Sequence, residues 1–155
     1  MNILYLFKSS GKNIKLAEKN LYPKLFYGYF ELRKNNNVQY MDVAKKYSLI
    51  RRVYNKFFHS NSLEKILYNN IDLLNEYDII YATTDGIAIE VSKLKQKNLL
   101  NVSVVANIMS IADNEIQKKH LHLLNNLNGL ICFSKKIETV LRENNVKKTR
   151  FIQFG

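Results

Sequence analysis

The sequence predicts an α/β fold, a doubly wound and mainly parallel sheet with helices on both faces. Short apolar runs typical of buried strands recur along the chain, clearest at Asp78–Thr83, Gly129–Ser134 and Thr149–Gly155. The first two runs are each followed by a longer stretch with helical periodicity. Because parallel strands need helical crossovers of one hand, this alternation indicates a sheet that is covered on both sides.

The first half of the chain begins with an apolar run, Asn2–Phe7, which predicts a buried strand in the centre of a sheet of about five to seven strands. The polar segment Lys8–Asn13 predicts a loop. A helix is expected over Asn20–Lys34, where apolar residues recur every three to five positions. Pro23 fits only the first turn of that helix or a kink in it. Val38–Asp42 predicts a second strand.

The second half predicts four more strands and three helices. Ser134 is expected to cap the last helix. The strands are expected at Asp78–Thr83, Val102–Ile108, Gly129–Ser134 and Arg150–Phe154, and the helices at Gly86–Leu99, Asn114–Leu127 and Lys135–Asn144.

Composition indicates one globular domain with a substantial core. The chain has 155 residues, of which 46% are hydrophobic and 24% charged. No run approaches the roughly 18 apolar residues that cross a bilayer, and the amino terminus lacks the pattern of a signal peptide. The single cysteine, Cys132, excludes a disulfide framework. We therefore expect a cytoplasmic protein.

The positive charge is unevenly distributed. The segment Met1–Lys65 contains 13 Lys and Arg but only four Asp and Glu. The remainder contains 11 Lys and Arg and nine Asp and Glu, and the net charge of the whole chain is +11. Such a field attracts an anionic partner, which the sequence leaves open among a membrane surface, a phosphorylated substrate and nucleic acid. A lysine- and asparagine-rich composition with a solvated basic surface is the alternative.

Ligands of doubly wound sheets bind outside the carboxyl ends of the strands. That rule selects polar residues from three predicted loops as candidate binding groups. A turn that binds nothing is the alternative for the first loop, and capping of a helix is the alternative for the second. The candidates are Ser10, Gly11 and Lys12, then Thr83, Thr84 and Asp85, then Asn107 and Ser110.

The segment Tyr47–His59 has the pattern of an amphipathic helix with an aromatic face and a basic face. Acidic residues are missing from it, as in helices that lie in a membrane interface. Packing of the apolar face on the sheet is the alternative. The residues assigned to membrane or anionic-acceptor contact are Arg51, Arg52, Tyr54, Lys56, Phe57 and Phe58.

Other chemistry finds little support in the sequence. His120 and His122 are two positions apart, so they do not share a helix face, and no zinc-ligand spacing occurs. Cys132 lies between Ile131 and Phe133 in a predicted buried strand, which indicates an inert thiol. No metal site, Ser-His-Asp arrangement or Cys-His arrangement is predicted.

Four segments in order resemble the acceptor-side half of family-4-like glycosyltransferases of the GT-B fold. They read "YDIIYATT" (77–84), "NVSVVANI" (101–108), "LNGLICFSKKIETVLRENNV" (127–146) and "FIQFG" (151–155), and together they cover roughly the last 80 residues. At the position of the family's His-Asp pair this chain has Met109 and Ser110, so the histidine's role is not carried over.

The resemblance implies that residues 1–155 form one Rossmann-like acceptor-side domain that ends at an inter-domain hinge, with the donor-binding half outside the chain. It implies a transferase that moves a sugar from a UDP- or GDP-sugar to a lipid-linked or glycan acceptor, for a cell-surface polysaccharide or glycolipid. The expected location is the inner face of the cell membrane, with peripheral contact to anionic lipid. No cofactor is expected in this domain.

Two other classes remain as alternatives. The basic first half and the ten tyrosines of the chain would suit a non-catalytic α/β domain that binds nucleic acid or another polyanion, although no nucleic-acid module signature is present. A flavodoxin-like regulatory domain is the third interpretation. Nucleic acid is not the expected partner.

Overall fold

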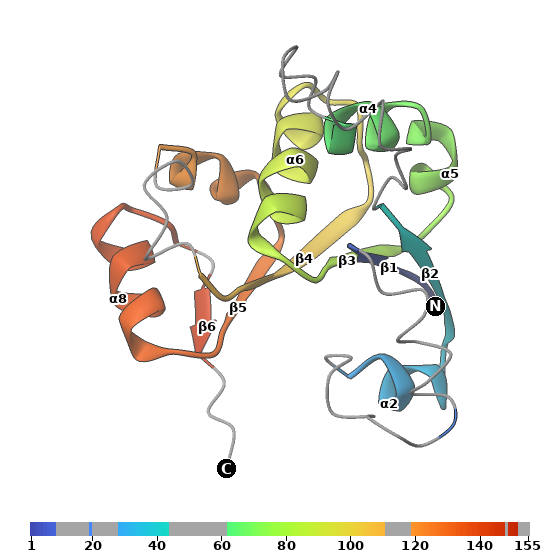
Figure 1. Cartoon of the computed structure of the whole chain (residues 1–155), viewed down its shortest axis with the longest axis horizontal. Helices are drawn as coiled ribbons and strands as arrows, with labels where there is room; N and C mark the ends of the chain where they lie inside the picture. Colours follow the sequence, from blue (N-terminus) through green and yellow to red (C-terminus); the bar gives the residue numbers. More distant parts are fainter. Residues whose placement is uncertain (9–18, 20–27, 44–61, 111–118, 148, 152–155) are drawn as a thin grey trace, which may run out of the picture.

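The computed structural model describes residues 1–8, 19, 28–43, 62–110, 119–147 and 149–151 (Figure 1). The described residues form a six-stranded sheet in the order β2-β1-β3-β4-β5-β6, and every neighbouring pair is parallel. The α/β fold predicted from the sequence is thereby confirmed. The strands are β1 (Asn2–Phe7), β2 (Asn37–Asp42), β3 (Ile79–Ala82), β4 (Ser103–Ile108), β5 (Gly129–Cys132) and β6 (Thr149–Phe151).

The helices lie on both faces of the sheet, as predicted. In Figure 1, α2 lies on one side of the strands, while α4, α5 and α6 lie on the other. The described helices that follow β3, β4 and β5 all pack on the second side, which agrees with right-handed connections that proceed in one direction across the sheet. The helices are α2 (Tyr29–Arg33), α4 (Ser62–Tyr68), α5 (Ile71–Asn75), α6 (Asp85–Gln96), the 3₁₀ helix η3 (Leu121–Asn126) and α8 (Lys135–Glu143).

The alternation of side chains along each strand divides the core into two layers. The larger layer packs residues such as Leu6, Ile80 and Ala106 against α4, α6, η3 and α8. The smaller layer is aromatic and packs Tyr5 of β1 against Tyr29 of α2. Complete burial of a large apolar side chain contributes about 1.5–3 kcal/mol, so the larger layer dominates the stability of the fold.

Two predicted helices differ from the structure. The helix expected over Asn20–Lys34 does not run through Gly28, which has φ +79 and precedes α2 as its N-cap. A glycine adopts this left-handed conformation at little cost, so the chain turns there. Residues 20–27 lie outside the described residues.

The helix expected over Asn114–Leu127 ends as a 3₁₀ helix instead of an α-helix. The buried leucines Leu121, Leu124 and Leu127 recur every three residues, which is the period of a 3₁₀ helix. Asn125 and Asn126 have low α-helical propensity and favour the tighter turn. Residues 111–118 lie outside the described residues.

Asparagine ends two of the helices that cross back to the sheet. Asn98 after α6 has φ 57, and Asn145 after α8 has φ 59. In each case the next residue donates its N–H five positions back, from Leu99 to Leu94 and from Val146 to Leu141. This is the Schellman motif with asparagine in the usual position of glycine. It redirects the chain toward β4 and β6.

The position of β1 departs in part from the prediction. The strand is interior, but it lies one strand from the edge, and β3 and β4 occupy the middle of the sheet. The order reverses between β1 and β3, because the chain leaves β1 toward β2 and all later strands add on the other side. Such a switch point is where doubly wound sheets usually bind their ligands.

Candidate functional site

The carboxyl ends of β1, β3 and β4 lie side by side at the switch point, and they bring together five of the predicted site residues. Asn107 is in β4 and Ser110 follows it, while the other three directly follow β3. These three are Thr83, Thr84 and Asp85. The remaining candidates of this group, Ser10, Gly11 and Lys12, lie outside the described residues.

Thr83 and Thr84 connect the end of β3 to its surroundings. The Thr83 hydroxyl is buried and donates a hydrogen bond to the Leu6 carbonyl of β1 at 2.7 Å. Thr84 is the N-cap of α6, but its side chain makes no capping hydrogen bond. Its carbonyl accepts the N–H of Ala88 at 2.9 Å. The hydroxyl proton of Thr83 is therefore already bound within the protein.

Asp85 connects α6 to the loop after β4. It is only 3% exposed, and one carboxylate oxygen accepts the Met109 N–H at 2.7 Å. The other oxygen accepts the Ser110 N–H at 2.8 Å and the Ser110 hydroxyl at 2.6 Å. Asp85 is also the first residue of α6, where the helix dipole favours a negative charge. The carboxylate thus holds the start of the loop after β4 against the amino end of α6.

Asn107 differs from these residues because one of its polar atoms has no partner. The side chain is fully buried, and its Oδ1 accepts the Tyr81 hydroxyl at 2.5 Å. Its Nδ2 makes no hydrogen bond. A buried unsatisfied donor costs about 1–3 kcal/mol and calls for an explanation, of which a bound acceptor group is one.

Aromatic rings lie beneath this polar pair. Tyr5 stacks on Tyr81 with ring centroids 4.5 Å apart, and it meets Tyr29 edge-on at 5.2 Å. Burial raises the pKa of Tyr5, and the neighbouring tyrosines raise it further, so its phenol stays neutral. These tyrosines were not among the predicted site residues. The sequence signal that could have found two of them is a tyrosine within each of two predicted strands, Tyr5 and Tyr81, which lie opposite each other in the sheet.

Cys132 lies on the opposite face of the sheet, in the larger core layer, and is fully buried. Burial is the main cause that raises the pKa of its thiol to about 11, and the charges of Glu138 and Asp85 add to it. At neutral pH the sulfur is a thiol and not a nucleophilic thiolate. This agrees with the inert cysteine that the sequence predicts.

The described residues contain no group of three or more His, Cys, Asp and Glu placed to hold a metal ion. In the same part of the chain, no helix is both long and apolar enough to cross a membrane.

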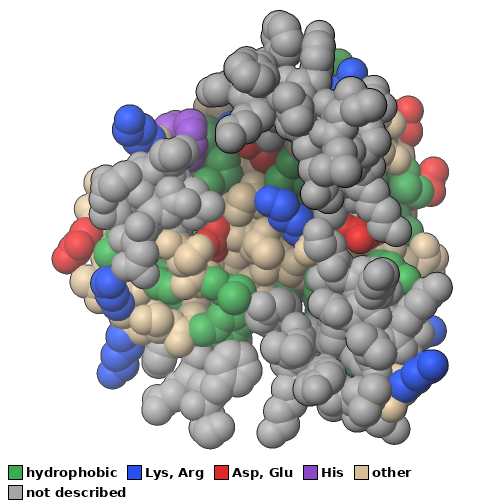
Figure 2. Space-filling model, viewed as in Figure 1, with side chains coloured by type: hydrophobic (Ala, Val, Ile, Leu, Met, Phe, Trp, Pro, Cys, Tyr) green, Lys and Arg blue, Asp and Glu red, His purple; other side chains and the backbone are tan. Residues whose placement is uncertain are grey.

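Most of the excess positive charge of the chain is carried by residues outside the described part of the structure. Ten of the 24 Lys and Arg, but only three of the 13 Asp and Glu, lie outside the described residues. Among described residues, basic and acidic side chains are interspersed on the face shown in Figure 2. The helix predicted over Tyr47–His59 also lies outside the described residues, and its membrane contact stays a prediction. Its candidates are Arg51, Arg52, Tyr54, Lys56, Phe57 and Phe58.

Comparison of the chain with protein-family models, curated proteins and solved structures gives no match. The site is therefore interpreted from its own geometry.

Proposed function

We propose that the chain is the acceptor-binding half of a glycosyltransferase that moves a sugar from a nucleotide-sugar donor to a polysaccharide or glycolipid acceptor at a membrane. The acceptor binds at the carboxyl ends of β1, β3 and β4. The Rossmann-like parallel sheet with its switch point supports this proposal, because that topology concentrates ligand sites at this edge.

The unpartnered amide of Asn107 is the single observation that carries the proposal. A hydroxyl or ether oxygen of a sugar is an acceptor that the Nδ2 group lacks in the protein. The Tyr81 hydroxyl holds the amide in place, and Asp85 holds the adjoining loop through Met109 and Ser110. In this arrangement Asp85 and Thr83 position the site, and Asn107 is the group proposed to contact the acceptor.

The test is binding of farnesyl-diphosphate-linked N-acetylglucosamine by calorimetry, with farnesyl diphosphate and N-acetylglucosamine as separate probes. We expect the double variant Tyr81→Phe/Asn107→Leu to bind the linked sugar at least tenfold more weakly, which is the loss of about one good hydrogen bond. Replacement of both partners by apolar groups of similar shape keeps the fold near wild-type stability, which thermal unfolding checks.

Tyr68→Phe is the matched control, because Tyr68 is 57% exposed on α4. A double variant with unchanged affinity would argue against the proposal. Binding of a (dT)₂₀ oligonucleotide without any binding of the linked sugar would also argue against it, because that result favours the polyanion-binding alternative.

A second prediction concerns the membrane. We expect the triple variant Arg51→Gln/Arg52→Gln/Lys56→Gln to lose about hundredfold in partitioning onto anionic phosphatidylglycerol vesicles at low salt. Each cation near such a surface contributes about 1 kcal/mol, so three contribute about 3 kcal/mol.

Vesicle co-sedimentation at low and high salt measures this effect. The matched control removes the same charge from α8 as Lys135→Gln/Lys136→Gln/Arg142→Gln. Equal binding by wild type and the first triple variant, or no binding by either, would remove the Tyr47–His59 segment from the proposal.

A further inference from the structure

One face of the sheet is only partly covered by described residues. On the side of α2, the covering helix lies next to β2 and packs on the aromatic layer around β1. Farther along the same face, Val105 of β4 and Ile131 of β5 are only half-buried, and Arg150 of β6 is exposed. No described helix packs on this part of the sheet. Parallel sheets normally bury both faces, so this exposed area needs an explanation.

A cavity of about 610 Å³ lies against this area, lined in part by these three residues and by Gly129. Gly129 pairs with Val105 across the two strands, and its missing side chain leaves a hollow. A Cβ added there would meet only the Val105 Cγ2 atom, at an ordinary 3.8 Å. The volume is within the range of small-molecule pockets, which is about 300–1,000 Å³.

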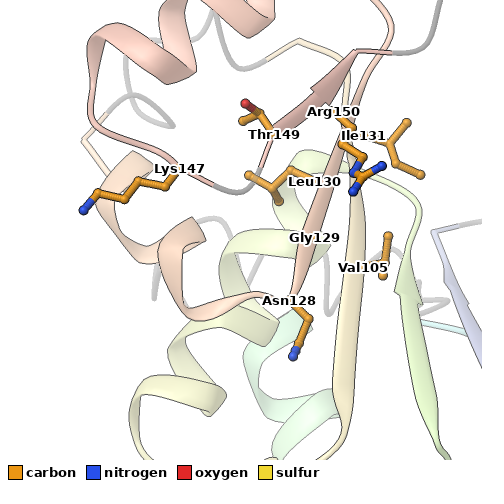
Figure 3. A pocket seen from close by; sticks show the side chains of 8 residues that line it. All are labelled: Val105, Asn128, Gly129, Leu130, Ile131, Lys147, Thr149 and Arg150. Carbon is orange, nitrogen blue, oxygen red and sulfur yellow. The ribbon is translucent and has the colours of Figure 1, made fainter.

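The hollow combines apolar side chains with two cations, of which only Arg150 points toward the other lining residues. In Figure 3, the Val105, Ile131 and Arg150 side chains lie on the same side of β5, and Arg150 is the register partner of Ile131 on the neighbouring strand. Lys147 also lines the cavity, but its ammonium group points away from the other labelled residues. No acidic residue is among the lining residues. Arg150 has no ion-pair partner in the described part of the chain.

We propose that this hollow binds a small molecule with a flat apolar body and one anionic group. The body lies over Gly129 between Val105 and Ile131, and the carboxylate or phosphate group pairs with Arg150. A guanidinium favours such planar anions because it can donate two parallel hydrogen bonds.

This hollow lies on the same face of the sheet as Asn107 and adjoins the acceptor site proposed above, because Ile131 is the register partner of Asn107 and Val105 that of Tyr81. Gly129 is the first residue of β5, so the hollow lies toward the amino ends of the strands. Asn107 and Ser110 lie at the opposite, carboxyl ends. The two proposals depend on different side chains, so Gly129→Val and Arg150→Gln test the hollow, while Tyr81→Phe/Asn107→Leu tests the acceptor site.

The experiment titrates 2-naphthoate and the neutral 2-naphthamide into protein labelled at its Val and Ile methyl groups. We expect saturable shifts of the Val105 and Ile131 methyl signals with 2-naphthoate. Binding of the amide is expected to be about tenfold weaker, because it cannot form the charged pair. Arg150→Gln should bring the affinity for the naphthoate down to that of the amide.

Gly129→Val is the decisive variant, because it fills the hollow without the backbone strain that a positive φ would cause. It should abolish the shifts caused by 2-naphthoate while thermal unfolding stays at or above the wild-type temperature. Lys135→Gln removes one exposed charge from α8 and should bind like wild type.

Shifts that persist in Gly129→Val would overturn the proposal. The absence of saturable shifts at Val105 and Ile131 up to millimolar 2-naphthoate would also overturn it. That result would indicate that a protein segment, and not a small molecule, covers this face.

Discussion

Asp85→Ala is expected to lower the free energy of unfolding by about 3 kcal/mol. The change removes the acceptor of three hydrogen bonds, from the Met109 and Ser110 N–H groups and from the Ser110 hydroxyl. A hydrogen bond to a charged group contributes about 1.5–3 kcal/mol. The summed contribution of the three hydrogen bonds is reduced here, because Met109 and Ser110 are exposed and water can solvate the donors that the variant releases. Loss of the negative charge at the start of α6 adds a few tenths of a kcal/mol.

Urea unfolding at pH 7 measures this effect. Asp72→Ala is the matched control, since Asp72 is an exposed acid in the first turn of α5. Its removal should change stability by less than about 0.5 kcal/mol. Asp85→Asn keeps one acceptor oxygen and should fall between wild type and Asp85→Ala. A loss below 1 kcal/mol for Asp85→Ala would show that the carboxylate does not hold the loop.

Tyr5→Ala is expected to cost about 4 kcal/mol or more. The ring is fully buried and contacts Tyr81, Tyr29 and Phe7 at centroid distances of 4.5, 5.2 and 5.7 Å. Removal of a buried aromatic ring costs about 3–5 kcal/mol, because apolar burial is lost and a cavity remains. Each aromatic pair adds about 0.5–1.5 kcal/mol.

The exposed Tyr68 again supplies the control, because Tyr68→Ala should change stability by less than about 0.5 kcal/mol. A natural domain has about 5–15 kcal/mol of stability, so Tyr5→Ala approaches the limit of folding. Tyr5→Leu, which refills part of the cavity, extends the measurement and should lose about half as much. Equal stability of Tyr5→Ala and Tyr68→Ala would contradict the assignment of Tyr5 to the core.

The amino-acid sequence alone determined the strands, the longer helices and the class of fold. Apolar runs at Asn2–Phe7 and Val102–Ile108 each match an observed strand to within a residue. The periodicity of α6 and α8 likewise placed their bodies. These features depend on the spacing of neighbouring residues, which local backbone geometry imposes. The 3₁₀ turn at η3 was missed, because a spacing of three is common to both kinds of helix.

The tertiary structure alone decided what each described candidate residue contacts. Thr83 meets Leu6 across 77 positions of sequence, Asp85 meets Ser110 across 25, and Tyr81 meets Asn107 across 26. These pairs depend on which strands become neighbours and in what register. The sequence placed the polar residues at the carboxyl ends of the strands, but it did not distinguish the bonded Asp85 from the unsatisfied Asn107. That difference arises from burial and partner geometry, which exist only once the sheet is assembled.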